Sequence, residues 1–178
     1  EVTTAARENG LATHMDGARL LNAVVASGIS AADYAAPFDS VWIDLSKGLG
    51  APVGAVLAGS SEFIDRAWRF KHQFGGAMRQ SGIIAAAGLY ALDKHVGRLA
   101  DDHTTARRFA QTLAQISGIR IDPDDVETNM VYFEISAGGL DAQEVAERLL
   151  KRGVRIGAVD RYRMRAVTHL DVDRSGVE

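Results

Sequence analysis

The sequence of 178 residues contains no cysteine, which excludes disulfides, thiolate metal sites and a cysteine nucleophile. It has no apolar run of the length that spans a bilayer. The net charge of −3 gives no sign of nucleic-acid or membrane binding. The five histidines show no metal-ligand spacing, and neither an HExxH nor an EF-hand pattern occurs. What remains, with 47% apolar and 24% charged residues, is the composition of an ordinary globular protein.

The two ends of the sequence indicate that it is part of a longer chain. The first residues lack an initiator methionine and read as the end of a helix closed by Gly10. They do not have the pattern of a signal peptide. The last residues stop soon after an apparent strand that ends near Leu170. We therefore expect a missing N-terminal portion and a truncated C-terminus.

Strands and helices alternate in the first half of the sequence. The apolar pattern predicts strands at residues 11–15, 40–45 and 53–58, and helices at residues 18–26 and 62–74. A long helical stretch follows over residues 80–117, in one piece or two. Residues 83–92 are apolar nearly all round, which predicts burial. This order is typical of an α/β domain.

The last part of the sequence has a different character. Short strands are expected at residues 119–121, 130–135, 154–156 and 164–170, and a helix at residues 141–151. We therefore expect a smaller α+β domain over residues 96–178, after an α/β domain over residues 1–95.

Lys47 lies in residues 44–54, a segment with three glycines that follows an apolar strand. The glycines permit a tight turn and the close approach of a ligand. A lysine amine in such a turn can form a Schiff base with a carbonyl cofactor, and burial would make it a better nucleophile. Taken alone, an exposed loop lysine is the commoner interpretation.

Asp16 lies 31 residues before Lys47, at the C-terminal end of a predicted parallel strand. Ligands of open α/β sheets bind at that edge. A carboxylate there can hold the protonated ring nitrogen of a pyridoxal cofactor by attraction between opposite charges. The alternative is that Asp16 caps the helix that begins near Ala18.

Two arginines lie near these residues in the predicted fold. Arg19 lies one turn into the helix after Asp16, where its guanidinium can bind a carboxylate or a phenolic oxygen; a surface salt bridge is the alternative. Arg79 ends a glycine-containing turn before the apolar helix, a place that suits a phosphate. No Walker spacing is present, so a structural glycine break explains this turn equally well.

Arg161, Arg163 and Arg165 alternate along the last predicted strand. Alternate residues of a strand share a face, so three guanidinium groups would line one side and bind an anion such as an amino-acid carboxylate. An exposed, charged edge strand is the alternative.

Together these motifs resemble those of the low-specificity threonine aldolases, pyridoxal-phosphate-dependent enzymes with the aspartate-aminotransferase fold. The matching stretches follow the family's order and cover residues 14–20, 39–41, 45–54, 75–80 and 165–171. The resemblance implies a fold class of α/β type: the C-terminal part of a fold-type I transferase large domain, followed by a small α+β domain. It also implies pyridoxal 5'-phosphate as the cofactor.

The resemblance implies a role for each candidate residue. Lys47 is the Schiff-base lysine, and Asp16 pairs with the pyridine nitrogen. Arg19 reaches the substrate carboxylate and the ring oxygen of the cofactor, and Arg165 is a second carboxylate-binding arginine. Arg79 lies near the cofactor phosphate and reaches across a subunit boundary. The family's phosphate loop and its ring-stacking histidine belong to the N-terminal half.

This sequence departs from the family's pattern near the glycine turn. His72 stands where many members have a lysine, and Ala77 replaces a common third glycine. Both changes bear on the substrate pocket, so an aromatic substrate such as phenylserine is a reasonable variant. His72 is also a candidate for the base that takes the substrate hydroxyl proton, alongside a histidine or water from the missing half.

By this resemblance the protein cleaves β-hydroxy-α-amino acids such as L-threonine or L-allo-threonine to glycine and an aldehyde. Two alternatives stay open. One is another fold-type I enzyme, a β-eliminating lyase or an aminotransferase. The other is a catalytically inert assembly fragment. We further expect a dimer or tetramer with a site shared between subunits, a cytoplasmic location, and neither nucleic-acid nor membrane partners.

Overall fold

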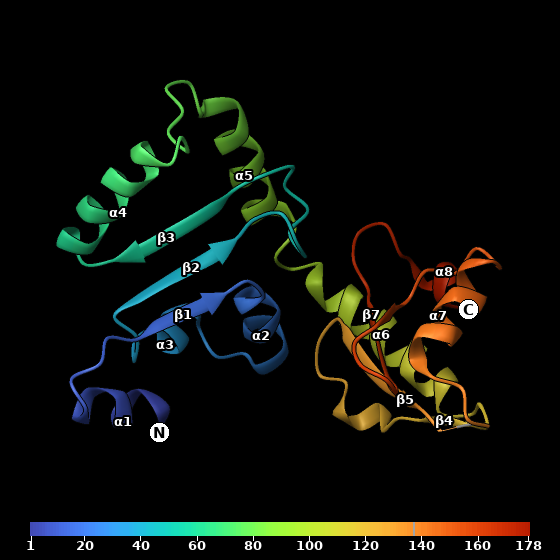
Figure 1. The fold of residues 1–178 in the computed structure, drawn as a ribbon. Helices are drawn as coiled ribbons and strands as arrows, with labels where there is room; N and C mark the ends of the chain where they lie inside the picture. Colours follow the sequence, from blue (N-terminus) through green and yellow to red (C-terminus); the bar gives the residue numbers. More distant parts are fainter. Residues whose placement is uncertain (137) are drawn as a thin grey trace. The chain divides into compact units, whose positions relative to one another are not determined.

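A computed structural model describes residues 1–136 and 138–178. The chain divides into two compact units, Glu1–Gly97 and Arg98–Glu178, each with its own sheet (Figure 1). The division falls between helices α5 (Gly82–Lys94) and α6 (Leu99–Leu113), close to residue 96, where the sequence leads us to expect the second domain to begin. We refer to these as the first and the second unit.

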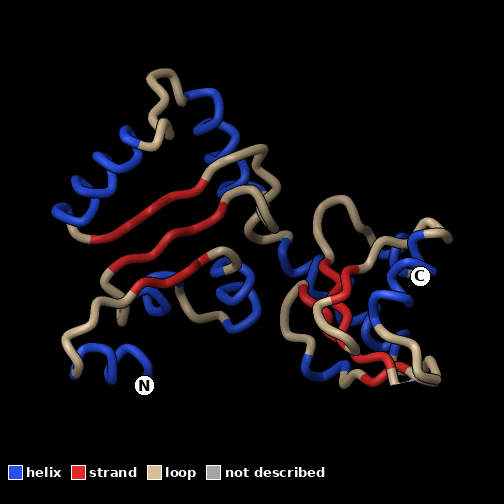
Figure 2. The backbone as a smooth tube through the Cα atoms, viewed as in Figure 1, coloured by secondary structure: helices blue, strands red, loops and turns tan. Residues whose placement is uncertain are grey.

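The sheet of the first unit has three strands, β1 (His14–Gly17), β2 (Ser40–Asp44) and β3 (Ala55–Gly59). They lie side by side in this order, with β2 in the middle (Figure 2). β1 runs parallel to β2, and β3 runs antiparallel to it. The strands predicted at residues 40–45 and 53–58 are confirmed within two residues, while β1 begins three residues later than predicted.

Five helices accompany this sheet: α1 (Val2–Glu8), α2 (Leu20–Ser27), α3 (Ala31–Ala35), α4 (Ser61–Gln73) and α5 (Gly82–Lys94). Gly28 ends α2 in the left-handed conformation, with φ of 74°, as its place after the apolar run predicts. Ser60 begins α4 by accepting a hydrogen bond from the Phe63 amide. The sequence reasoning missed α3, whose five residues are too few to show a helical apolar period.

The predicted burial of residues 83–92 is wrong for this chain. Only Gly88 and Ala91 of α5 are buried, and Ile83 is 86% exposed. A helix that is apolar all round is buried only where protein surrounds it on every side. Here only Gly88 and Ala91 of α5 are buried, and Gly88 lies close to the side chain of Leu45.

The second unit pairs four strands with helices on its flanks. Its elements are α6 (Leu99–Leu113), β4 (Ile119–Arg120), the 3-10 turn η1 (Pro123–Asp125), β5 (Met130–Ile135), α7 (Ala142–Leu150), β6 (Gly157–Ala158), β7 (Arg163–Val167) and α8 (Arg174–Val177). The strand order is β4-β5-β7-β6, with every neighbouring pair antiparallel. The predicted strand at residues 154–156 is wrong, because β6 lies just after it.

One apolar core holds the second unit together. Alternate residues of β5 face it, namely Val131, Phe133 and Ile135, and Met164 of β7 joins them. Residues of α6 and α7 cover the same core, including Ala106, Ala110, Leu113 and Ala142. The helix α7 begins with a capping box in which Asp141 and Glu144 satisfy each other's backbone amides.

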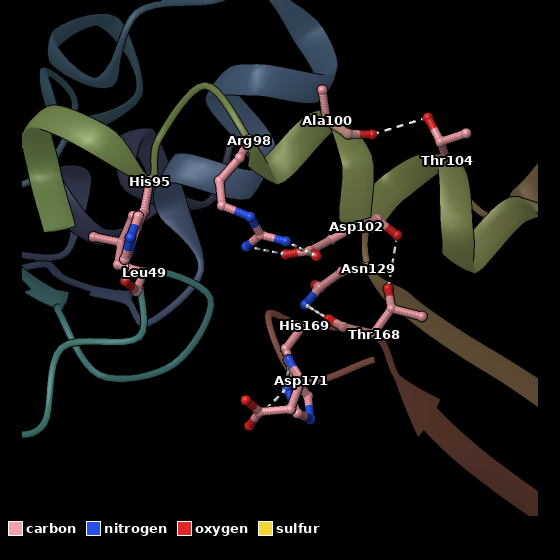
Figure 3. Close-up of polar contacts among 10 residues, drawn as sticks. All are labelled: Leu49, His95, Arg98, Ala100, Asp102, Thr104, Asn129, Thr168, His169 and Asp171. Carbon is pink, nitrogen blue, oxygen red and sulfur yellow. Dashed lines mark hydrogen bonds and ion pairs between the residues drawn. The ribbon is translucent and has the colours of Figure 1, made fainter. Parts of the chain in front are cut away.

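A buried polar cluster joins α6 to the ends of β5 and β7 (Figure 3). The Asp102 carboxylate is 2% exposed and accepts two hydrogen bonds from the Arg98 guanidinium, at 2.5 and 3.2 Å. Thr168 Oγ1 donates to the carbonyl of Asp102 at 2.7 Å, and Asn129 Nδ2 donates to the carbonyl of Thr168 at 2.8 Å. These bonds fix the chain segment that follows β7.

Two absences can be stated for residues 1–136 and 138–178. None of their helices combines the length and the apolar character that crossing a membrane requires. Nor do the described residues hold a group of three or more metal-binding side chains.

Candidate active site

The loop that carries Lys47 begins with a turn that the Asp44 carboxylate closes. This carboxylate accepts hydrogen bonds from Ser46 Oγ at 2.8 Å, the Lys47 amide at 2.9 Å and the Ser46 amide at 3.3 Å. Partial burial raises the pKa of Asp44, but these hydrogen bonds and the nearby Lys47 charge outweigh it and hold the pKa below its ordinary value. The ionised carboxylate therefore fixes the backbone on the N-terminal side of Lys47.

Backbone hydrogen bonds and buried side chains hold the rest of this loop. The Gly50 amide donates to the carbonyl of Lys47 at 3.0 Å, and Gly50 has the left-handed φ of 68° that this turn requires. The Ala51 amide donates to the carbonyl of Leu45 at 2.9 Å. Leu45, Leu49 and Ala51 are all buried. The loop therefore has an apolar base, and Lys47 lies at its exposed side.

Lys47 is exposed, which agrees with the commoner interpretation of a loop lysine and not with the burial that would make it a better nucleophile. Its side chain does not join the buried residues at the base of the loop. Its Nζ instead lies over the ring of Trp42, 5.3 Å from the ring centroid. This is a cation–π contact, which holds the amine above one face of the sheet.

Asp16 and Trp42 are paired in register on the neighbouring parallel strands β1 and β2. Residues in register point to the same face of a sheet. A hydrogen-bonding contact of 2.8 Å between His14 Nδ1 and Ser40 Oγ, the register pair two residues earlier, shows this directly. The Lys47 amine thus contacts the ring of Trp42, and Asp16 is the register partner of Trp42 on the neighbouring strand.

The capping alternative for Asp16 is partly realised. Asp16 Oδ1 accepts a hydrogen bond from the Ala18 amide at 3.0 Å. The residue that precedes α2, however, is Arg19, and α2 has no side-chain cap. Asp16 thus closes a local turn two residues ahead, and its exposed carboxylate remains accessible at the end of β1.

Gly17 explains how β1 and β2 approach each other beside Asp16. Gly17 is buried, and a Cβ at this position would collide with the carbonyl oxygen of Trp42. Only glycine therefore allows the end of β1 to lie this close to the strand that leads to Lys47. Gly17 thus brings the end of β1, which carries the Asp16 carboxylate, close to β2.

Arg19 supplies the clearest sign of a missing binding partner. Its Nε is buried and makes no hydrogen bond within residues 1–136 and 138–178. A buried donor without an acceptor is costly, so such groups normally have a partner. An anionic or phenolic oxygen beside Asp16 would satisfy this donor. The lysine amine, the carboxylate and the unpaired guanidinium nitrogen are therefore a donor set that fits pyridoxal phosphate.

His72 and Arg79 are exposed, and neither makes a polar contact with Lys47 or Asp16 in the part of the chain that the structure describes. The His72 ring meets the ring of Trp68 edge-on at 5.2 Å, at the end of α4. Arg79 lies in the connection from α4 to α5. Their predicted roles stay predictions.

The second unit carries the arginines expected on one strand. Arg163 and Arg165 lie on the exposed face of β7, opposite the buried Met164. Arg161 precedes the strand, so two guanidinium groups line this face instead of three. The edge-strand alternative is wrong, because β7 lies between β5 and β6. The carboxylate-binding role of Arg165 stays a prediction.

Sequence reasoning missed Trp42 and Asp44, the two residues that position the Lys47 amine and its turn. Trp42 resembles any other apolar residue of a strand, because its side-chain contact with Lys47 depends on the turn that follows. Asp44 had a local signal, since an aspartate two residues before a turn serine commonly accepts backbone hydrogen bonds.

Comparison with known proteins finds related sequences along most of the chain. A family model described as "Beta-eliminating lyase" matches residues 1–136. The low specificity L-threonine aldolase of Escherichia coli K12 is 45% identical over 168 residues, which are 94% of this chain and 48% of that protein. Low-specificity L-threonine aldolase 1 of Arabidopsis thaliana is 39% identical over 173 residues, 97% of this chain and 48% of that protein. The chain thus spans about half the length of the curated relatives it matches.

Solved structures show the same fold at low sequence identity. A Leishmania major threonine aldolase superposes with a TM-score of 0.70 at 19% identity, over 99% of this chain and 52% of that one. A Lactobacillus brevis glutamate decarboxylase gives a TM-score of 0.72 at 13% identity, over 99% of this chain and 47% of that one. The chain therefore has the expected fold, part of that of the fold-type I enzymes. From this fold and the family match over residues 1–136, we conclude that the chain belongs to the beta-eliminating lyase family.

Proposed function

We propose that this chain carries the Schiff-base lysine of a pyridoxal-phosphate-dependent lyase that cleaves β-hydroxy-α-amino acids to glycine and an aldehyde. The observation that carries the proposal is that the Lys47 amine lies over the ring of Trp42, the register partner of Asp16 on the neighbouring strand. The relatives named as threonine aldolases support threonine or allo-threonine as substrate. The departures at His72 and Ala77 leave phenylserine as a variant substrate.

Each of the three candidate residues of the first unit has a definite role in this proposal. When bound, pyridoxal phosphate supplies an electron sink for the bond broken at the substrate Cα. The Lys47 amine holds the cofactor covalently between turnovers. The Asp16 carboxylate keeps a proton on the ring nitrogen, because a negative charge nearby favours the charged ring. Arg19 donates Nε–H to an oxygen of the cofactor or the substrate, which satisfies its buried nitrogen.

Three assignments rest on the resemblance alone. Arg165 is proposed to bind the substrate carboxylate, since its guanidinium is exposed on β7 and a planar guanidinium matches a carboxylate bidentately. Arg79 is proposed to lie near the cofactor phosphate, and His72 near the substrate. Binding the carboxylate through two arginines would orient the scissile bond, which is a positioning effect.

β-Elimination is the second candidate, and the family model's description favours it. The same lysine and carboxylate serve both reactions, so the products decide between them. Glycine and an aldehyde indicate aldol cleavage. Pyruvate and ammonia from a substrate with a β-leaving group indicate elimination.

We also propose that the protein self-associates in the cytoplasm. The support for self-association is that α4 and α5 leave large apolar side chains exposed, among them Phe63, Trp68, Phe70, Ile83, Leu89 and Leu92. Exposed patches of this kind mark protein–protein interfaces. The support for a cytoplasmic location is the resemblance to the threonine aldolases.

Replacing Lys47 by alanine tests the proposed function. We expect the visible absorption band of the bound cofactor to disappear and turnover of threonine to fall by at least about a thousandfold, because the covalent nucleophile is lost. Lys71→Ala is the matched control, since Lys71 is exposed on α4 and stacks on Trp68. It should keep both properties. Retention of the band and of turnover by Lys47→Ala would refute the assignment.

A further inference from the structure

We propose that His95 is a positioning residue that fixes the Lys47 loop by donating a hydrogen bond to the carbonyl oxygen of Leu49. His95 directly follows α5, and its Nδ1 lies 2.5 Å from that oxygen (Figure 3). The two residues are 46 positions apart in the sequence, so the bond ties the end of the helix to the loop. The catalytic meaning of this bond rests on the proposed function, whereas its effect on the loop does not.

The chemistry of the partner fixes the role of the histidine. A backbone carbonyl can only accept, so Nδ1 of His95 carries the hydrogen. The histidine backbone is itself held, because its amide donates to the carbonyl of Ala91 at 2.9 Å. The ring of Tyr90 meets the His95 ring edge-on, with centroids 5.4 Å apart. The half-buried imidazole is therefore oriented from two sides toward the loop.

Leu49 is the point of the loop where such a donor matters. It is the third residue of the turn that the Gly50 amide closes onto the carbonyl of Lys47, and it is 3% exposed. Within the described residues, its carbonyl accepts no hydrogen bond from a backbone amide. Without His95 this carbonyl would have no protein partner at a buried position, and a buried carbonyl without one is costly.

Two residues, which we call clamps, thus fix the turn by hydrogen bonds on the two sides of Lys47: Asp44 as an acceptor and His95 as a donor. Asp44 accepts hydrogen bonds from the amides of Ser46 and Lys47 on the N-terminal side of the turn, and His95 donates to the Leu49 carbonyl on its C-terminal side. The first clamp is local in sequence, and the second comes from the end of α5. Loss of the second would leave the turn attached at one end, which displaces the amine that must meet the cofactor carbonyl. Small displacements of a reacting group reduce catalysis strongly.

Two substitutions in the full chain separate the hydrogen bond from the packing of the ring. His95→Phe keeps an aromatic ring against Tyr90 but has no donor. His95→Asn loses the ring but keeps an N–H at the position of Nδ1. Tyr90→Leu is the matched control, because it removes the edge-on contact and leaves the His95 donor in place.

We expect His95→Phe to raise the dissociation constant for pyridoxal phosphate about five- to tenfold, the loss of one hydrogen bond. Amide hydrogen exchange at Gly50 and Ala51 should become faster by a similar factor, because both amides lie in the loop. His95→Asn and Tyr90→Leu should stay within about twofold of the native protein in both measurements. With threonine as substrate, kcat should fall more than KM changes in His95→Phe.

Native exchange at Gly50 and Ala51 in His95→Phe would overturn the proposal, and so would a His95→Asn variant that exchanges as fast as His95→Phe. Should His95→Phe fail to fold, His95→Ala takes its place as the variant without a donor. The exchange measurement needs no cofactor. A native protein that binds no pyridoxal phosphate would therefore refute the proposed function while the exchange rates still decide the role of His95.

Discussion

The second unit buries its apolar side chains around one core, whereas the first leaves many of its largest ones exposed. Phe133 of the second unit is 3% exposed, but Phe70 and Phe74 of the first are 51% and 81% exposed. The first unit carries Lys47, Asp16 and Arg19, and its loop is fixed by polar contacts with Asp44 and His95. The candidate site is therefore held by hydrogen bonds, on a unit whose exposed apolar side chains suit contact with other protein.

Substitution of a core aromatic residue should show the largest difference between the units. Phe133→Ala removes a side chain from the single core of the second unit, and we expect a loss of about 3–5 kcal/mol. Phe70→Ala, on the exposed side of α4, should cost less than about 1 kcal/mol. Both tryptophans, Trp42 and Trp68, lie in the first unit, so fluorescence follows that unit and circular dichroism follows both. A large loss in Phe70→Ala would contradict the comparison.

The buried ion pair of the second unit should give the next largest effect. Asp102→Asn leaves the Arg98 guanidinium without its charged partner, and we expect a loss of about 2 kcal/mol in chemical denaturation. Arg98 is partly solvated, which keeps this below the cost at a fully buried pair. Glu134→Gln is the control, because its pair with Arg120 is exposed and contributes about 0.5 kcal/mol or less. Equal losses would show that burial does not decide the strength of these pairs.

Acid pH should have the smallest effect, and it should act on both units through the same kind of turn. Hydrogen bonds hold the pKa of Asp44 below its ordinary value, against a rise from burial. The amides of Tyr162 and Arg163 lower the pKa of Asp160 in the second unit. A carboxyl with a lowered folded-state pKa stabilises the fold above its unfolded pKa, and that contribution is lost as pH falls through the folded value.

The native protein should therefore lose more stability between pH 6 and pH 3 than Asp44→Asn or Asp160→Asn does. Thermal unfolding followed by fluorescence checks Asp44, and circular dichroism checks Asp160. Identical acid sensitivity of the native protein and both variants would mean that neither carboxylate stabilises its turn.

Elements with strong local signals were predicted well from the sequence. The helix predicted at residues 141–151 is found as α7, which begins at the capping pair Asp141 and Glu144, and the strand predicted at residues 130–135 is found as β5, where buried Val131, Phe133 and Ile135 alternate. Gly28 marked the end of α2. Each of these signals depends on residues within one turn or one strand, so no knowledge of the tertiary fold was needed.

The features that depend on tertiary contacts were not predictable. The exposure of α5 depends on what packs against it, and the helix is apolar on every side. The interior place of β7 depends on β6, whose two residues, Gly157 and Ala158, show no strand pattern. For the site, Lys47, Asp16 and Arg19 were proposed from the sequence, whereas the contacts of Trp42 and His95 join residues that only the fold brings together.

The attachment point of the cofactor tests the central claim most directly. The protein is loaded with pyridoxal phosphate, reduced with borohydride and digested, and the labelled peptide is identified by mass spectrometry. The chain has four lysines, Lys47, Lys71, Lys94 and Lys151. We predict that the label is found on Lys47. A label on one of the other three, or none on the chain, would contradict the account.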